Sequence, residues 1–339
     1  MIEIILLLTF SNFLILINFR KISKFINIFD KPDNKLKRHK LSTPILGGIV
    51  VGINLLIYLF LSLFLETPFK NLDISTKEYL SIFFFITSLF LLGLYDDKYK
   101  LNPEKKFFFS IFFSILVLSL NKYLLIQNLT FSFSDKNISL NDFSFFFTIF
   151  CIIVLINALN FYDGINGQSL IYLITLLSYL SYQSPLQSFY IVLILICTLI
   201  LFLNLNDKTF LGDGGIYLLG SILSILLIYE HNIFKTIKFA DEIFLLLILP
   251  GFDLLRLTIK RLISGKNAFY GDRNHIHHLL AKKFSLLSSN LILFNISIIP
   301  IILFSYFKMN FFLIFFIFFV VYVSLILILK SNDKKYNHR

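Results

Sequence analysis

Tryptophan is absent from the 339 residues, and cysteine and methionine occur only twice each. The two cysteines, Cys151 and Cys197, both lie inside apolar runs, which argues against a disulfide framework or a thiolate metal site. Charged residues are also scarce, at 15%, whereas 57% of the residues are hydrophobic and the mean hydropathy is +0.81. These deficits exclude an ordinary soluble globule and predict a polytopic membrane protein, in which tyrosine must supply any aromatic belt.

Apolar runs long enough to cross a bilayer are abundant. A spanning helix needs about 20 mostly apolar residues. The first run lacks the cationic start and small-residue cleavage site of a signal peptide, so we expect it to remain as a span. No soluble domain fits between the spans, so residues 1–339 are predicted to form one all-α domain, a bundle of about eleven transmembrane helices with cytoplasmic active-site loops. The predicted spans lie near 3–19, 45–65, 79–94, 107–120, 145–160, 169–182, 189–203, 214–229, 243–259, 290–306 and 310–329.

The net charge of +11 is distributed unevenly. If the amino terminus is external, the internal loops and the carboxyl-terminal tail hold 23 of the 31 Lys and Arg residues, against seven in the external loops. This asymmetry follows the positive-inside rule, so membrane topology and anionic lipid explain the charge and nucleic acid is not needed. The longest external loop, 121–144, alternates apolar and polar residues and is predicted to form a short hairpin on the membrane.

The concentrated polar motifs all fall in the predicted internal loops. Polar groups at span ends are costly unless they serve a site, so this clustering predicts a single active surface at the cytoplasmic face. The motifs are DKPDNKLKRHKLSTPILGG (30–48), LYDDKYKLNPEKK (94–106), NALNFYDGING (157–167), FLGDGG (210–215) and GDRNHIHHLLAKK (271–283).

Two of these motifs carry acidic residues suited to phosphate chemistry. Asp96 and Asp97 end a span and are followed within ten residues by four lysines, including Lys106. A carboxylate pair can hold a divalent cation or accept a proton, and lysine can bind phosphate; a solvated helix end is the alternative. Asp213 stands between glycines that open the next helix, where backbone N–H groups can approach a phosphate. An Asp-capped glycine turn is the alternative there.

Amide and imidazole groups form the other two sets. Asn157, Asn160, Asp163 and Asn166 recur at intervals of three and are predicted to share one helical face that recognises a base, ribose or sugar. A structural polar network between helices is the alternative. The histidines at 275, 277 and 278, with Arg273 and two lysines, are predicted to form a phosphate-binding surface, with zinc as the minor alternative because nothing completes a tetrahedral ligand set. Aspartate ligands favour Mg²⁺ or Mn²⁺, and the whole inventory suits phosphoryl transfer.

In these motifs the chain resembles the polyprenyl-phosphate N-acetylhexosamine-1-phosphate transferases, which include phospho-N-acetylmuramoyl-pentapeptide transferase and the GlcNAc-1-phosphate transferases. The resemblance rests on DDKYKLNPEKK, NALNFYDGING, FLGDGG and DRNHIHHLL in the family's order, with a looser match in DKPDNKLKRHKLSTPILGG. It implies ten or eleven transmembrane helices and transfer of sugar-1-phosphate from a UDP-N-acetylhexosamine to a polyprenyl phosphate, undecaprenyl phosphate in bacteria, with release of UMP.

The resemblance also implies roles for individual residues. Asp213 would ligate Mg²⁺, while Asp96 and Asp97 would activate the lipid phosphate or help hold the metal. Phe210 would stack on uracil, and the histidine segment would face the diphosphate or sugar. The implied substrate-binding set is Lys106, Asn157, Asn160, Asp163, Gly164, Asn166, Phe210, Arg273, His275, His277 and His278.

Some residues depart from the family pattern or stay ambiguous. Ile216 stands where Ser is usual, and Asn166 where an acid is common. Asp253 and Arg256, three apart after Pro250, are predicted to pair near the site or as a structural ion pair.

DRNHIHHLL resembles the GlcNAc-1-phosphate branch and implies an enzyme that initiates a cell-surface polysaccharide in a bacterial inner membrane, with the carboxyl terminus cytoplasmic. The alternatives are the pentapeptide transferase and a transporter, which should carry ionisable residues near span midpoints. A homodimer is left open.

Overall fold

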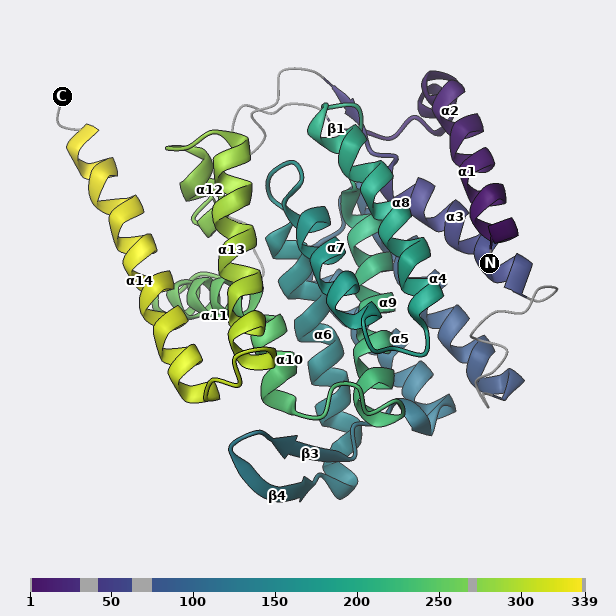
Figure 1. The fold of residues 1–339 in the computed structure, drawn as a ribbon. Coiled ribbons are helices and arrows are strands. Elements are labelled where there is room, and N and C mark those ends of the chain that lie inside the picture. Colours follow the sequence, from purple (N-terminus) through teal and green to yellow (C-terminus); the bar gives the residue numbers. More distant parts are fainter. Residues whose placement is uncertain (1, 31–41, 63–74, 268–272, 337–339) are drawn as a thin grey trace.

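The computed structural model describes residues 2–30, 42–62, 75–267 and 273–336 (Figure 1). Apart from two small sheets, the regular elements of these ranges are helices, as the sequence predicts. The helices are α1 (Ile2–Ile17), α2 (Phe19–Ile26), α3 (Gly47–Ser62), α4 (Thr76–Tyr99), α5 (Pro103–Leu120), η2 (Lys122–Leu124), η3 (Asn141–Phe143), α6 (Ser144–Tyr162), α7 (Gln168–Ser181), α8 (Gln187–Leu205), α9 (Gly212–Asn232), α10 (Ala240–Leu246), α11 (Ile248–Ile263), α12 (Ile276–Ala281), α13 (Leu286–Ser305) and α14 (Phe311–Tyr336). The strands β1 (Phe29–Asp30) and β2 (Thr43–Pro44) pair antiparallel, as do β3 (Asn128–Phe131) and β4 (Ser134–Ser139).

Within the described residues the predicted spans are helical, one of them as two consecutive helices, which confirms an all-α polytopic membrane protein. Six spans within the described ranges are long and apolar enough to cross a bilayer, carried by α4, α6, α8, α9, α13 and α14. The α1–α2 pair, bent by 73°, would make a seventh, whereas α3 and α7 are shorter apolar helices. The total of eleven transmembrane helices therefore stays a prediction.

The predicted span 243–259 is interrupted rather than continuous. It divides at Leu247 into α10 and α11. Pro250 has no N–H to donate to the carbonyl of Leu246, and its ring clashes with that carbonyl in an unbroken helix. The hydroxyl of Tyr172 donates to the Leu246 oxygen at 2.8 Å. A neighbouring helix thus satisfies the carbonyl that the break releases.

The loops within the described residues separate into two groups at opposite ends of the bundle. We call the end that holds the predicted motif loops the motif end, and the end that holds β3 and β4 the hairpin end (Figure 1). At the motif end, Thr209 donates to the Pro44 carbonyl at 2.9 Å. At the hairpin end, the backbone N–H of Ser132 donates to Asp241 at 2.9 Å. Loops distant in sequence therefore meet at each end.

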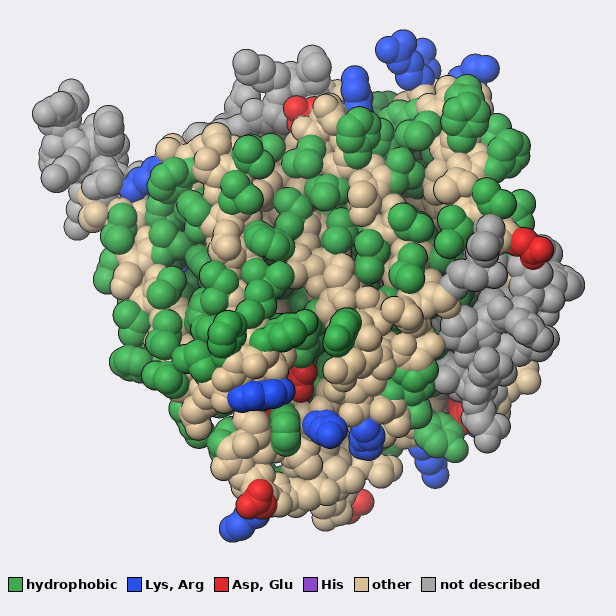
Figure 2. Space-filling view, in the orientation of Figure 1, with side chains coloured by type: hydrophobic (Ala, Val, Ile, Leu, Met, Phe, Trp, Pro, Cys, Tyr) green, Lys and Arg blue, Asp and Glu red, His purple; other side chains and the backbone are tan. Residues whose placement is uncertain are grey.

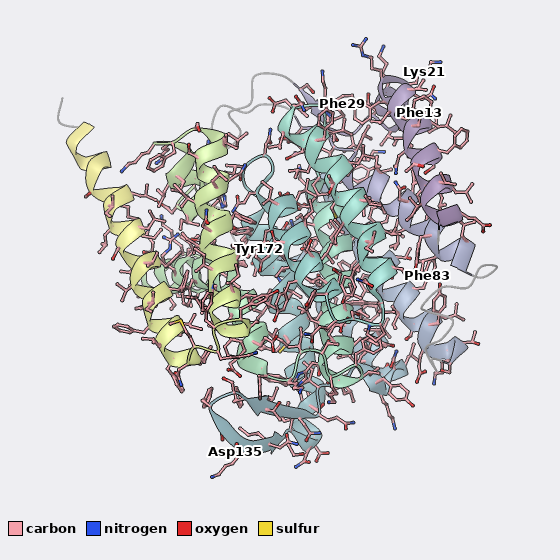
Figure 3. The ribbon with its side chains drawn as sticks, in the orientation of Figure 1. Phe13, Lys21, Phe29, Phe83, Asp135 and Tyr172 are labelled. Carbon is pink, nitrogen blue, oxygen red and sulfur yellow. The ribbon has the colours of Figure 1, made fainter. Side chains whose placement is uncertain are left out.

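Side-chain chemistry follows the same division. Figure 2 shows hydrophobic side chains across the middle of the bundle, with Lys and Arg towards its upper and lower ends. Lys21 and Phe29 lie at the motif end and Asp135 at the hairpin end (Figure 3). The predicted hairpin in loop 121–144 is confirmed, with Asn128 opposite Ser139. An apolar middle between polar ends is the arrangement that a bilayer requires.

Helix α9 forms the centre of the bundle, and its apolar window is 89% buried. Small residues let neighbouring backbones approach it closely. A Cβ added to Gly48 of α3 would lie 2.3 Å from the Gly215 nitrogen, and one added to Gly93 of α4 would lie 2.5 Å from the Asp213 oxygen. These glycine crossings bring the start of α9 against the end of α4, where the acidic motifs lie.

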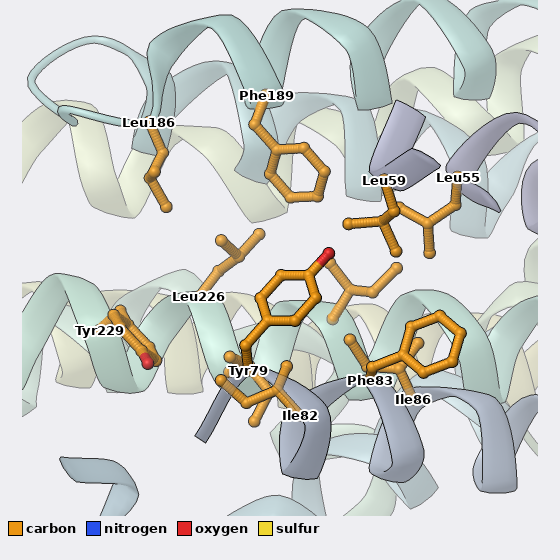
Figure 4. A pocket seen from close by; sticks show the side chains of 12 residues that line it. Leu55, Leu59, Tyr79, Ile82, Phe83, Ile86, Leu186, Phe189, Leu226 and Tyr229 are labelled. Atoms are coloured by element: carbon orange, nitrogen blue, oxygen red, sulfur yellow. The ribbon is translucent and has the colours of Figure 1, made fainter. Parts of the chain in front are cut away.

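A partly open apolar pocket lies in the hairpin-end half of the bundle, between α3, α4, α8 and α9 (Figure 4). Its lining is aliphatic and aromatic, with tyrosines at positions 79 and 229. Such a surface suits hydrocarbon. The polar chemistry of the protein lies at the other end.

Candidate active site

Three residues from two of the predicted motifs meet at the motif end. Asp96 lies in the last turn of α4, Asp213 in the first turn of α9, and Lys106 in the first turn of α5. The Lys106 Nζ lies 2.9 Å from Asp96 Oδ2 and 2.9 Å from Asp213 Oδ2. The Asn102 side chain caps α5 by accepting from the Glu104 N–H at 3.1 Å, and this cap sets the direction of the helix. A local cap thus delivers the lysine to two distant carboxylates.

Asp97 caps a helix that is not its own. Its two carboxylate oxygens accept from the backbone N–H groups of Asp213 and Gly214, each at 2.9 Å. The first N–H groups of a helix have no partners within it, and the N-cap residue Leu211 has no side-chain acceptor. Gly212 has φ +76°, and a Cβ there would lie 2.6 Å from Asp97. Asp97 therefore stabilises the start of α9 and holds Asp213 in place.

The group has the donors and the charge to hold a divalent cation. Two carboxylates, Asp96 and Asp213, share the Lys106 amine, an excess of negative charge that a cation would balance. Asp97 is already committed to backbone N–H groups, whereas the Asp213 side chain is 29% exposed against 5% for Asp96. Burial by itself would lower the pKa of Lys106, but the Asp213 and Asp96 carboxylates raise it above its usual value, so the amine stays charged. Asp213 and Asp96 are the residues that would hold Mg²⁺.

The prediction that the NFYDGING polar residues share one helical face is wrong. Helix α6 ends at Tyr162, so only Asn157 and Asn160 lie on it. The Asn157 side chain donates to the Ile153 carbonyl of its own helix at 2.8 Å. Beyond α6 the chain turns, and Gly167 opens α7 with φ +84°. The glycines interrupt the helical spacing because they permit this turn.

Asp163 lies within the electrostatic influence of the acidic group. Burial raises its pKa to about 6, the Ser169 hydroxyl that donates to it opposes the rise, and the charge of Asp213 adds to it. Asn166 instead ties loops together, because its side chain donates to Asp207 at 2.6 Å and its carbonyl accepts from Asn290 at 2.9 Å. The structure thus brings Asp163 towards Asp213 and gives Asn166 a loop-holding position.

The position of Phe210 is set by the loop that precedes α9. Its backbone N–H donates to the Pro44 carbonyl at 3.0 Å, and it forms a parallel bridge with Ile45. This pairing joins FLGDGG to the end of the first predicted motif.

The histidine segment packs directly on the NFYDGING loop. His275 caps the start of α12, and its ring stacks on that of His277 with centroids 5.2 Å apart. A Cβ on Gly164 would lie 1.8 Å from His277 Nε2, so only glycine allows this approach. Burial lowers the pKa of His277 well below its usual value, and the neighbouring His278, His275 and Arg273 lower it further. His277 is therefore neutral at pH 7.

Sequence reasoning missed Arg261. Its buried guanidinium lies 5.4 Å from the ring centroid of Phe161, and its NH2 nitrogen lies 3.5 Å from His275 Nε2. In the sequence, Arg261 looks like another of the basic residues that the positive-inside rule places in internal loops. Asp253, His275 and His277 offer ligand atoms within 4.8 Å of one another, as a zinc site would. The neighbouring arginines make this cluster favour an anion instead.

These features define a polytopic membrane protein with a carboxylate–lysine group and a histidine–arginine cluster at one end of its spans. Comparison with known proteins agrees. The model of glycosyl transferase family 4 matches residues 79–231. This match and the relatives described below support the resemblance to the polyprenyl-phosphate N-acetylhexosamine-1-phosphate transferase superfamily.

Named relatives cover most of the chain. The undecaprenyl-phosphate alpha-N-acetylglucosaminyl 1-phosphate transferase of Escherichia coli (strain K12) is 26% identical over 275 residues, covering 78% of this chain and 71% of the relative. The protein of the same name from Yersinia pestis is 28% identical over 276 residues, with 78% and 72% covered. The probable undecaprenyl-phosphate N-acetylglucosaminyl 1-phosphate transferase of Bacillus subtilis (strain 168) is 27% identical over 299 residues, with 84% and 79% covered.

Proposed function

We propose that the protein transfers N-acetylhexosamine-1-phosphate, specifically GlcNAc-1-phosphate, from a UDP-sugar to undecaprenyl phosphate, and so starts a cell-surface polysaccharide. The observation that carries this proposal is the group in which Lys106 bridges Asp96 and Asp213 at the motif end, where α4, α5 and α9 meet. The names of the relatives support both the acceptor and the sugar. The protein would work in a bacterial inner membrane with its motif end in the cytoplasm and its amino terminus outside.

The reaction is a displacement at phosphorus. A phosphate oxygen of undecaprenyl phosphate attacks the phosphorus that bears the sugar. The bond from that phosphorus to the bridging oxygen breaks, and UMP leaves with the electron pair. The protein must orient the attacking and leaving oxygens on either side of the transferred phosphorus, and it must balance the negative charge of the phosphates. Orientation and charge balance provide most of the catalysis of phosphoryl transfer.

Residues of this chain orient the substrate phosphates and balance their negative charge. Lys106 is held between carboxylates and would donate to a phosphate oxygen of the substrate. Asp97 keeps the start of α9 in place, so that Asp213 faces the same point as Asp96. Mg²⁺ bound by Asp213 and Asp96 would supply neutralisation of the diphosphate charge.

The second cluster would bind the remaining anionic and polar parts of the donor. Arg261 and His275 lie side by side and favour a phosphate oxygen. Asp163, half-buried between the two clusters, would accept from a ribose or sugar hydroxyl. This division gives the donor two anchoring regions on either side of the NFYDGING loop.

The test is UMP release by purified protein with undecaprenyl phosphate and Mg²⁺. UDP-GlcNAc, UDP-GalNAc and UDP-muramoyl-pentapeptide are supplied in parallel. We expect release with UDP-GlcNAc and its loss in Asp213→Ala. Asp135→Ala, which removes an exposed carboxylate at the hairpin end, is the matched control and should keep full activity (Figure 3).

The other outcomes separate the alternatives. Turnover with the pentapeptide donor alone would identify a pentapeptide transferase. Flux across proteoliposomes without UMP release would identify a transporter. No product with any of the three donors, from folded protein, would overturn the proposal.

A further inference from the structure

A buried carboxylate at the motif end gathers donors from three elements. Asp253 of α11 is 3% exposed. Its Oδ1 accepts from Arg256 at 2.6 Å, from the Tyr322 hydroxyl at 2.8 Å and from the Ile276 N–H at 3.2 Å. Its Oδ2 lies 2.8 Å from Nδ1 of His275. One side chain therefore joins α11, α14 and the start of α12.

These contacts decide where the histidine carries its proton. An ionised carboxylate only accepts hydrogen bonds, so the nitrogen that faces Asp253 must carry hydrogen. The opposite nitrogen, Nε2, lies 3.5 Å from Arg261.

The histidine belongs to the same polar region as the acidic group. Its ring stacks on His277, which contacts Gly164, the neighbour of Asp163. The charge of Asp213 in turn contributes to the raised pKa of Asp163. A set of contacts thus runs from Asp253 through His275 and His277 to the loop that holds Asp163.

We propose that Asp253 is a positioning residue for the reaction, which holds the Nδ1–H of His275 and so presents Nε2, beside Arg261, to the anionic substrate. This inference rests on the proposed function of the site. Tyr322 supports the arrangement from α14, because it donates to Asp253 and accepts from Arg256 Nε at 2.7 Å. The last helix thereby helps to orient a group in the active site.

Asp253→Asn is the informative change. Three donors converge on Oδ1, so the amide oxygen takes that place and the NH2 group takes the place of Oδ2. The amide NH2 group then donates to Nδ1 of His275, so the ring hydrogen moves to Nε2. Nδ1 can no longer take up a second proton, because it faces a donor instead of a carboxylate. We expect kcat/KM to fall on the order of 10²-fold or more, since loss of the correct tautomer or of proton exchange has effects of that size.

A double-mutant cycle separates positioning from simple structural support. If Asp253 acts through His275, then adding Asp253→Asn to His275→Gln costs no further activity, and both single variants lose the same limb of the pH profile. Full multiplication of the two losses, or an unchanged pH profile in Asp253→Asn, would overturn the proposal. Glu230→Gln is the matched control, because Glu230 is a buried carboxylate at the hairpin end that accepts from the Tyr190 hydroxyl at 2.7 Å. It should alter thermal stability without altering the pH profile.

A measurement on the wild-type protein covers the case in which Asp253→Asn fails to fold. Nitrogen-15 NMR of histidine-labelled protein, with His275→Gln to assign the signal, should show hydrogen on Nδ1 of His275. A ring protonated at Nε2 alone would refute the inference. The NMR measurement does not need turnover. If the wild-type protein released no UMP with any donor, the proposed function would be refuted, and the tautomer of His275 would still decide whether Asp253 positions the ring.

Discussion

Replacing Gly164 by alanine tests how the histidine segment is held on the NFYDGING loop. A Cβ at this position would lie 1.8 Å from Nε2, 2.4 Å from Cδ2 and 2.5 Å from Cε1 of His277. Unbonded carbon atoms settle at roughly 3.5–4.0 Å. His277 is 1% exposed, and its Nδ1 faces Gln168 at 3.3 Å, so the ring cannot swing into solvent.

The size of the effect follows from this geometry. The ring or the loop must move by about 1.7 Å or more to reach an acceptable separation. Overpacking of this kind costs roughly 1–3 kcal/mol of unfolding free energy. Displacement of a site group by about 1 Å lowers activity on the order of 10²-fold. We therefore expect Gly164→Ala to lose both stability and turnover.

Thermal unfolding in detergent and UMP release measure the two effects. Gly251→Ala is the matched control, because a Cβ at this α11 position meets nothing within 4 Å. It should keep stability or gain up to about 1 kcal/mol from helix propensity. Adding His277→Ala to Gly164→Ala should restore stability without restoring activity. A Gly164→Ala protein with the Tm and turnover of the wild type would refute the contact.

Three further changes test other parts of the site and the bundle. Lys106→Met leaves the buried Asp96 and the half-buried Asp213 without their cation, so unfolding free energy should fall by roughly 3 kcal/mol and Mg²⁺ should raise the Tm more than in the wild type; equal Mg²⁺ shifts would contradict this. The pKa of Asp163 is raised to about 6, so its contribution to stability is present at low pH and is lost as pH rises through about 6. Asp163→Asn should flatten that part of the pH–stability curve, and Ser169→Ala, which removes a bond to the ionised form, should move it to higher pH. Gly48→Ala should cost roughly 1–3 kcal/mol, because its Cβ would meet backbone at 2.3 Å, whereas Gly220→Ala, with its nearest contact at 3.4 Å, should be tolerated; equal Tm values would count against the close crossing.

Local features explain which parts of the fold were predictable. Apolar runs mark the helices because burial in lipid demands them, and alternating residues in 121–144 mark the hairpin. The helical face predicted for NFYDGING was wrong beyond Tyr162, since spacing alone does not register the turn that Gly164 and Gly167 permit. The break at Leu247 likewise depends on Pro250 and on a hydroxyl from another helix.

Hydropathy and motif content are properties of short segments, so they were enough to predict the membrane class, most helix positions and the polar residues of the motif end. Which of those residues meet depends on how the helices pack. Asp97 caps α9 from 116 residues away, through an approach that glycines on α3, α4 and α9 allow. Arg261 is recognised beside His275 only once α11 and α12 are packed together. Such contacts depend on how closely helix backbones pack, and that is a property of the assembled bundle.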